Sequence, residues 1–249
     1  MKAIILLAGH AKRMRPLSSY LNKGMIPVAG CPLAEYVLRS LVRQGFCDII
    51  MAVTAFPEQL QYHFGDGSRF GAHIEYALRP QPSGTAGEVH ALRPLIPPGE
   101  SFLVHYGDIL TNLDLQGMRA QHEATGALAT VGLVTDVQIH AGVAGLDKDN
   151  RVIYFEEKPQ VGRPCHAAVD IFGPGIWPWL APGLDFGYDV IPKLVAAGEN
   201  VRGFLDGSAW WLDVGRISDL EDAAALVHRV GWAPRFAGAD AGAGSWAQA

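Results

Sequence analysis

The chain has 249 residues, of which 49% are hydrophobic and 18% are charged. That composition can bury the core of one large domain, and it excludes global disorder. The net charge of −5 argues against nucleic acid or an anionic membrane as a partner. No apolar run approaches the ~20 residues of a transmembrane helix. The three widely spaced cysteines predict reduced thiols and a cytoplasmic location.

The first half of the chain alternates predicted strands with predicted helices. Ala3 to Ala8 is a continuous apolar run, as expected for a strand that is buried on both faces. A helix follows between Pro32 and Gly45, where apolar residues recur at helical spacing. The same alternation continues with strands at 48–53, 73–78 and 101–106, and helices at 57–64 and 85–92. This order predicts βαβ units and a mainly parallel sheet.

The second half is richer in strands. We predict strands at 129–134, 143–146, 151–155, 167–172 and 201–205, and helices at 188–197 and 217–230. We therefore expect one domain over residues 1–230, of the α/β class. Its Rossmann-like, doubly wound sheet should be mixed but mainly parallel, with a smaller strand-rich part. Residues 231–249 are rich in Gly and Ala and lack periodicity, which predicts a disordered tail.

The loop after the first strand carries an unusual concentration of positive charge. Lys12, Arg13 and Arg15 stand within a few residues of Gly9. In an open α/β sheet, ligands bind beyond the carboxyl ends of the strands. Backbone N–H groups near Gly9 can add to a phosphate-binding nest. The loop therefore predicts an anion site, although a solvated surface loop is the simpler alternative.

A dinucleotide-binding fold does not fit this loop. That fold needs G-x-G-x-x-G after the first strand and an acidic residue about 20 positions further on. Gly9 is the only one of the three glycines present, and Asn22 and Lys23 stand in the region where the acid is expected.

Further polar segments follow other predicted elements, and each has an ordinary explanation when it is taken alone. Asp108 could cap a helix that begins at 112–115. Lys23 could be solvated, and Lys158 could be an exposed lysine in a turn. The segments are Asn22 to Gly30, Gly84 to Gly87, Val104 to Leu110, Phe155 to Pro159 and Trp211 to Gly215.

The order and spacing of these segments resemble the sugar-1-phosphate nucleotidyltransferases, also called nucleotide-sugar pyrophosphorylases. That family opens with a pattern near L-A-G-G-x-G-T-R-L-x-P-L and continues with P-K-P-M-x-P-V-x-G-x-P-L. The matching residues here are Leu7-Ala8-Gly9, Arg13, Pro16-Leu17, Lys23, Met25, Pro27-Val28, Gly30 and Pro32-Leu33. The resemblance extends from residue 1 to about 229. It implies transfer of a nucleotidyl group from a nucleoside triphosphate to a sugar 1-phosphate, with release of pyrophosphate.

The resemblance also implies roles for individual residues. The catalytic residues it implies are Arg13, Lys23 and Asp108. Those expected to bind the nucleotide are Ala8, Gly9, Lys12, Arg13, Arg79, Gln81, Gly84, Thr85 and Asp108. Those expected to bind the sugar phosphate are Lys23, Gly142, Glu157, Lys158, His166 and Asp170. Asp108 and Asp213 match two carboxylates that hold Mg²⁺, a cation that prefers hard oxygen ligands.

In the reaction that the resemblance implies, an oxygen of the sugar phosphate attacks the α-phosphorus of the triphosphate. The substrate supplies an ionised nucleophile, so the protein positions the two reactants and neutralises charge. We expect a nucleoside triphosphate and a sugar 1-phosphate as ligands. The formation of a homo-oligomer is left open by the sequence.

Several positions depart from the family pattern. Ala11 and Lys12 replace Gly and Thr in the first loop, and His166 and Asp170 replace Asn and Tyr in a later strand. These changes leave the sugar undetermined. They also leave two alternative functions. One is a non-catalytic regulatory subunit that binds a nucleotide sugar, and the other is a cytidylyltransferase that acts on a non-sugar phosphate.

The nucleobase is also left open, because either of two residues could recognise it. Pyrimidine-using relatives carry Gln five residues before the glycine that Gly84 matches, and this position is Arg79 here. Arg offers only donors, which suits the O6 and N7 acceptors of guanine. Gln81 lies two residues on and offers both a donor and an acceptor, which suits uracil or thymine. We lean towards guanine.

Overall fold

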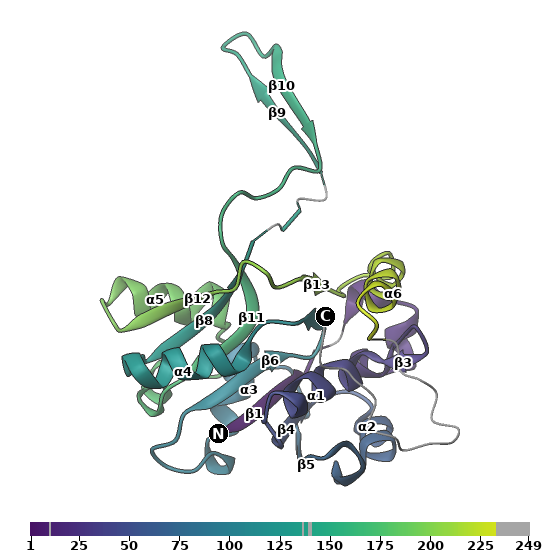
Figure 1. The fold of residues 1–249 in the computed structure, drawn as a ribbon, viewed down its shortest axis with the longest axis vertical. Coiled ribbons are helices and arrows are strands. Elements are labelled where there is room, and N and C mark those ends of the chain that lie inside the picture. Colours follow the sequence, from purple (N-terminus) through teal and green to yellow (C-terminus); the bar gives the residue numbers. More distant parts are fainter. Residues whose placement is uncertain (10, 136, 139–140, 233–249) are drawn as a thin grey trace.

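The computed structural model describes residues 1–9, 11–135, 137–138 and 141–232. Its centre is a seven-stranded sheet in the order β12-β8-β11-β6-β1-β4-β5 (Figure 1). The neighbours β6, β1, β4 and β5 pair in parallel, whereas β11 runs antiparallel to both β6 and β8. The strands are β1 (Lys2–Leu7), β4 (Asp48–Val53), β5 (His73–Leu78), β6 (Phe102–Tyr106), β8 (Ala129–Val134), β11 (Cys165–Phe172) and β12 (Val201–Leu205). The predicted mixed, mainly parallel sheet is confirmed.

Helices cover both faces of this sheet, so the doubly wound arrangement is also confirmed. One face packs against α1 (Leu33–Arg43), α2 (Pro57–Phe64) and α4 (Leu115–Thr125). The other packs against α3 (Thr85–Ala91), α5 (Ile191–Ala196) and the turns η6 (Pro174–Trp179) and η7 (Phe186–Val190). Successive residues of a strand point to opposite faces, and Ile4 and Ile5 accordingly belong to different core clusters.

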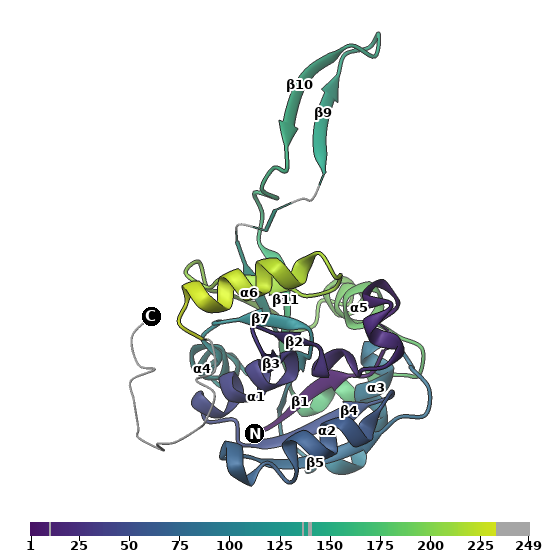
Figure 2. The same cartoon turned by 90° about the vertical axis from the view of Figure 1, so that its right-hand side faces the viewer.

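A third apolar layer lies at the carboxyl edge of the parallel strands. Helix α6 (Asp219–Arg229) packs there over short strands, as Figure 2 shows. These strands are β2 (Pro27–Val28), β3 (Cys31–Pro32), β7 (Ile109–Thr111) and β13 (Trp211–Asp213). The ring of Trp232 lies 5.5 Å from that of Tyr36 and 5.2 Å from that of Trp210. Packing therefore continues two residues past 230, and residues 233–249 of the predicted tail lie outside the described residues.

A two-stranded hairpin projects from the body in both views (Figures 1 and 2). It consists of β9 (Gly142–Leu146) and β10 (Val152–Glu157), paired antiparallel. Its apolar side chains are mostly in contact with solvent, with Ile153 69% and Phe155 63% exposed. The strand-rich half of the chain thus divides between the main sheet and this hairpin.

Several predicted elements are confirmed to the residue, including the strands at 48–53, 73–78, 129–134 and 201–205 and the helix at 57–64. The helix near residue 112 begins at Leu115. Its cap is Asp114, whose carboxylate accepts the N–H of Gly117 at 2.9 Å, so Asp108 is not the cap. The short 3₁₀ turns are η1 (Lys12–Met14), η2 (Leu17–Ser19), η3 (Lys23–Met25), η4 (Ser68–Phe70) and η5 (Arg93–Leu95). Among the helices of the described residues, none combines the length and the hydropathy of a transmembrane span.

Candidate active site

Two acids and a lysine from distant parts of the sequence meet beyond the carboxyl end of β6. Asp108 lies in the turn between β6 and β7, and its carboxylate forms an ion pair with Lys23 Nζ. Asp213 ends β13, which pairs with β7 so that Asp213 faces Ile109. The Val214 N–H donates to the carbonyl of Asp108 at 2.9 Å and fixes the two turns together. The sequence placed both acids at strand ends, and the structure brings them to one place.

The charges of this cluster act on one another. Burial raises the pKa of the Asp213 carboxyl, and the nearby charge of Asp108 raises it further, while Lys23 and Arg13 oppose the rise. Gly215 makes room for the contact, because a Cβ at that residue would lie 3.1 Å from Arg13 Nη2 and 3.2 Å from both carboxylate oxygens of Asp213. Arg13 therefore approaches the acids from the first loop.

Lys23 is held by a network that sequence reasoning missed. The buried Asn22 accepts the Gly24 N–H at 2.8 Å through its side chain, and its Nδ2 donates to the carbonyl of Ala55 at 2.6 Å. Its own N–H donates to Gln59 Oε1 at 2.9 Å. Buried side-chain hydrogen bonds of this kind fix backbone position strongly. Asn22 thus takes over, by hydrogen bonding, the restraint that the family pattern supplies with proline.

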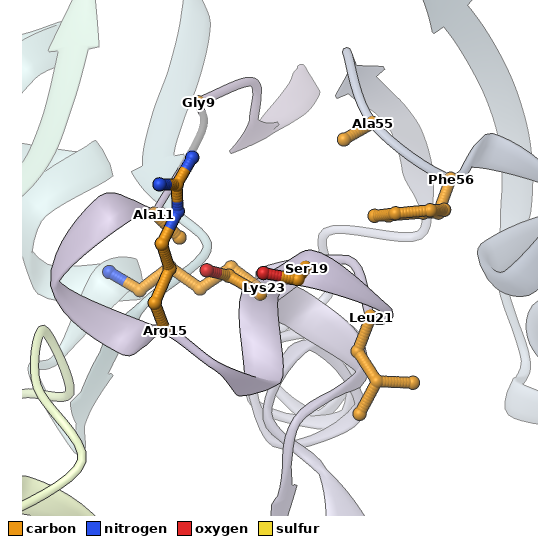
Figure 3. A pocket seen from close by; sticks show the side chains of 9 residues that line it. Gly9, Ala11, Arg15, Ser19, Leu21, Lys23, Ala55 and Phe56 are labelled. Carbon is orange, nitrogen blue, oxygen red and sulfur yellow. The ribbon is translucent and has the colours of Figure 1, made fainter.

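A pocket of about 240 Å³ opens beside Lys23 (Figure 3). Arg15 and Lys23 lie on one side of it and Phe56 on the other. Its volume is below the ~300–1,000 Å³ of typical ligand pockets, so it suits part of a nucleotide, such as its phosphates. The lining residues are Gly9, Ala11, Arg15, Ser18, Ser19, Leu21, Lys23, Ala55 and Phe56.

The pocket agrees only in part with the predicted nucleotide residues. Ala8 and Gly9 follow β1 directly and are half-buried, and Gly9 lines the pocket. Lys12 is exposed and does not line it, whereas Arg15, which the resemblance did not include, does. Ala11 has a left-handed backbone with φ of 41°, which costs energy for any residue with a Cβ and recurs at functional loops.

The segment that begins at Gly84 has a packing role that was not predicted. Gly84 has φ of 71°, and a Cβ there would collide with the carbonyl of Leu184. The N–H and hydroxyl of Thr85 donate to Asp185 Oδ1 at 2.9 and 3.0 Å. The Phe186 N–H in turn donates to the Thr85 hydroxyl at 2.9 Å. These contacts fasten α3 to residues 182–186, and contact of Gly84 and Thr85 with a nucleobase stays a prediction.

The two candidate readers of the base have different surroundings. Arg79 is half-buried, and its Nε lies 3.0 Å from Glu88 Oε2. The other oxygen of Glu88 accepts the N–H of Ser83 at 2.7 Å, so this buried acid fixes both the loop and the guanidinium. Gln81 is exposed.

The residues predicted to bind the sugar phosphate fall into two groups. His166 and Asp170 lie on β11 within the main sheet, and the His166 ring is 6.3 Å from that of Tyr106. Gly142, Glu157 and Lys158 are exposed on the projecting hairpin or at its end. The first group therefore lies in the body of the protein, on the strand that pairs with β6, whereas the second group belongs to the hairpin, which projects from the body (Figure 1).

Asp108 and Asp213 could hold a divalent cation. No group of three or more His, Cys, Asp or Glu in the described part of the chain could hold a metal by itself. Two carboxylates with phosphate oxygens and waters are the ligand set that Mg²⁺ takes at nucleotide sites. Burial and the nearby charge of Asp108 raise the pKa of Asp213, and a bound cation would oppose that rise. The donor set fits such an ion.

Comparison with protein families agrees with this site. A model of the family described as nucleotidyl transferase matches residues 2–230. The chain therefore belongs to the nucleotidyl transferase family.

Named relatives give a finer comparison. The UTP–glucose-1-phosphate uridylyltransferase of Synechocystis sp. is 31% identical, over 90% of this chain and 62% of that protein. The mannose-1-phosphate guanylyltransferase of Mycobacterium tuberculosis is 28% identical, over 95% of this chain and 67% of that protein. The N-acetylmuramate alpha-1-phosphate uridylyltransferase of Neisseria meningitidis is 32% identical, over 91% and 98%. The chain thus spans about two thirds of the length of the first two relatives and nearly all of the third.

A solved structure supports the fold. It is that of a putative glucose-1-phosphate thymidylyltransferase from Bacillus anthracis, which aligns with a TM-score of 0.75 over 91% of this chain and 94% of that one. The sequence identity of the pair is 22%, so the likeness concerns the fold alone.

Proposed function

We propose that this chain transfers a nucleotidyl group from a nucleoside triphosphate to a sugar 1-phosphate, giving a nucleotide sugar and pyrophosphate. One observation carries the proposal: Lys23, Asp108 and Asp213 meet beside a pocket with cationic walls. Family membership and the names of the relatives support the same activity.

The cationic and the acidic side chains of the site have different roles in this proposal. Arg13, Arg15 and Lys23 approach the phosphates of the two substrates and offset their charge. Asp108 and Asp213 would hold Mg²⁺, which would supply positive charge to offset the charge of the phosphate groups. The acceptor phosphate is itself the nucleophile, so positioning and neutralisation are the protein's contribution.

The role of the hairpin residues in this proposal depends on the position of the hairpin. Gly142, Glu157 and Lys158 serve the acceptor only if the hairpin approaches the acids. His166 and Asp170 lie on β11, which pairs with β6 and is hydrogen-bonded to Trp211 on the strand of Asp213. We propose that the β11 residues form the fixed part of the acceptor site.

For the nucleobase we propose guanine, read by Arg79. The half-buried guanidinium held by Glu88 favours Arg79 as the reader over the exposed Gln81. One of the named relatives is a guanylyltransferase and two are uridylyltransferases, so the comparisons leave both kinds of base available.

We further propose that the protein is cytoplasmic, as the three free thiols of Cys31, Cys47 and Cys165 favour, and that it can form a homo-oligomer. The ligands are a nucleoside triphosphate and a sugar 1-phosphate. The acidic net charge gives no support to a nucleic-acid partner.

The test is pyrophosphate release in a panel of triphosphates and sugar 1-phosphates at saturating Mg²⁺. Turnover with at least one sugar 1-phosphate, absent when Mg²⁺ is chelated, is the expected result. Tight binding of nucleotide sugars without turnover would favour the regulatory subunit. Turnover with CTP and a non-sugar phosphate alone would favour the cytidylyltransferase.

A further inference from the structure

A strand irregularity on β11 brings together two side chains that a regular strand would keep apart. At ~3.3 Å per residue, side chains four residues apart on a strand are separated by about 13 Å. His166 Nε2 nevertheless lies 3.0 Å from both carboxylate oxygens of Asp170. The four steps from His166 to Asp170 oppose only two steps on β8, from Leu133 to Val131. A bulge therefore forms the pair.

This bulge is held in place against a backbone preference. Ala168 lies within it with φ of 56°, a left-handed conformation that is unfavourable for alanine. Trp211 Nε1 donates to the carbonyl of the neighbouring Ala167 at 2.9 Å. Trp211 stands two residues before Asp213 on β13, so the bulge is tied directly to the strand that carries one of the two acids. Bulges of this kind re-aim side chains near active sites.

The pair has a defined charge state. Asp170 is fully buried, where a carboxylate needs a partner. Burial of His166 opposes its protonation, but the charge of Asp170 and its hydrogen bond outweigh burial, and the pKa of His166 is raised. When the ring is protonated both nitrogens are donors. Nε2 donates to Asp170, and Nδ1 is the remaining donor of a side chain that is 30% exposed.

Two titratable side chains on β6, the strand that pairs with β11, do not supply a cation here. Burial raises the pKa of Tyr106, so that hydroxyl stays neutral. Burial lowers the pKa of His105 to about 4, so that ring is neutral as well. Asp108, beyond the end of β6, is paired with Lys23. Among these side chains, His166 alone is favoured in its cationic form.

We propose that Asp170 is a positioning residue that holds His166 as a charged hydrogen-bond donor to the phosphate group of the acceptor substrate. The proposal rests on the proposed function for the identity of that substrate. A phosphate oxyanion complements a protonated Nδ1–H, whereas a sugar hydroxyl is equally served by a neutral ring.

The first experiment measures the histidine directly by NMR of the full chain with labelled histidine. His166→Gln identifies the signal, and inorganic phosphate, glucose 1-phosphate and glucose are the probes. Phosphate and glucose 1-phosphate should shift the His166 signal, and glucose should not. His166→Gln should weaken phosphate binding roughly tenfold, the size of one charge-assisted hydrogen bond. An equal shift with glucose, or unchanged phosphate binding in the variant, overturns the proposal.

Asp170 is tested by the titration of the same signal. Asp170→Asn should lower the pKa of His166 and weaken phosphate binding at neutral pH. Ala168→Gly is the matched control, because it changes the bulge residue without removing a polar group, and it should leave both values near those of the native chain. If Asp170→Asn does not fold, phosphate binding by His166→Gln still tests the part of the proposal that concerns His166. An unchanged pKa of His166 in folded Asp170→Asn refutes the positioning role.

Kinetics separate this inference from the proposed function. His166→Gln should raise the KM of the acceptor and leave the KM of the triphosphate unchanged. The ratio of the acceptor KM in the variant to that in the native chain should fall as pH rises, because His166 then loses its proton. Comparing the two chains at each pH cancels the titration of the substrate phosphate itself, near pH 6. An equal rise in both KM values contradicts the inference. If no acceptor supports pyrophosphate release, the proposed function fails while the NMR result still decides the inference.

Discussion

Two lysines that the sequence associates with phosphate have very different surroundings in the structure. Lys23 has a side chain that is only 16% exposed, and it is paired with Asp108. Lys158 is exposed at the end of the β9–β10 hairpin, which projects from the body (Figure 2). The first lysine is preorganised by the fold, and the second depends on where the hairpin lies.

The difference has a physical origin in packing. The body covers both faces of its sheet with helices and buries its large apolar side chains. A two-stranded hairpin by itself is marginally stable in water, and this one leaves most of its apolar side chains exposed. Precise positioning therefore belongs to the body, and the acceptor side of the site combines a fixed group on β11 with a separate group on the hairpin.

The largest expected effect contrasts the two regions in stability. Phe172 is fully buried and stacks on Phe186 at 4.5 Å, so Phe172→Ala should lower the free energy of unfolding by about 3–5 kcal/mol. Phe155 on the hairpin is 63% exposed, so Phe155→Ala should cost less than about 1 kcal/mol. Urea unfolding of both variants measures the contrast. Similar losses would show that the hairpin packs against the body in solution.

The next effect concerns the acids. Asp108→Asn and Asp213→Asn should each lower kcat by on the order of 10² to 10³, the cost of removing one well-placed electrostatic group, without loss of the fold. Asp149→Asn, an exposed acid in the turn of the hairpin, is the matched control and should be neutral. Pyrophosphate release at limiting Mg²⁺ is the measurement. Near-native turnover in either site variant would remove that residue from the proposed metal site.

Much of the fold could be predicted because buried parallel strands have a local signature. The strands at 48–53 and 129–134 are short and mainly apolar, and they appear where they were predicted. The three-residue strand β7 was missed, because it is defined by a partner about 100 residues away.

The candidate site was predictable to the same degree. Strand-end acids and a flanking lysine have recognisable positions, and the structure brings Asp108, Asp213 and Lys23 together. The pairing of His166 with Asp170 was not predictable, since it needs a bulge that depends on Trp211 as well as on the strand itself. The projecting position of the hairpin has no sequence signal that we can identify.

A smaller effect tests whether the hairpin reaches the acceptor. Lys158→Ala should raise the KM of the sugar phosphate roughly tenfold, because a charge-assisted contact to phosphate is lost, and should change the KM of the triphosphate much less. Lys148→Ala removes the same charge from the turn of the same hairpin and should change neither value. Equal effects of Lys158→Ala on the KM values of both substrates would contradict the prediction that Lys158 binds the sugar phosphate specifically. No effect at all would place the hairpin outside the acceptor site.

The smallest expected effect is on base preference. A bidentate contact from Arg to guanine discriminates by ~1–3 kcal/mol. Because one donor of Arg79 is already bound by Glu88, we expect the lower end of that range. Arg79→Gln should therefore reduce the preference for GTP over UTP, measured as the ratio of kcat/KM values, by about fivefold.

Two further variants make this last prediction decisive. Glu88→Gln keeps the shape of the side chain but weakens its hold on Arg79, so it should reduce the preference for GTP in the same direction and by less. Gln81→Ala should leave the preference unchanged, because Gln81 is exposed. A native preference for UTP or dTTP that survives Arg79→Gln and collapses in Gln81→Ala would identify Gln81 as the reader. In that case Glu88 and Arg79 serve only to hold the loop before α3, as the bond from the Ser83 N–H to Glu88 already does.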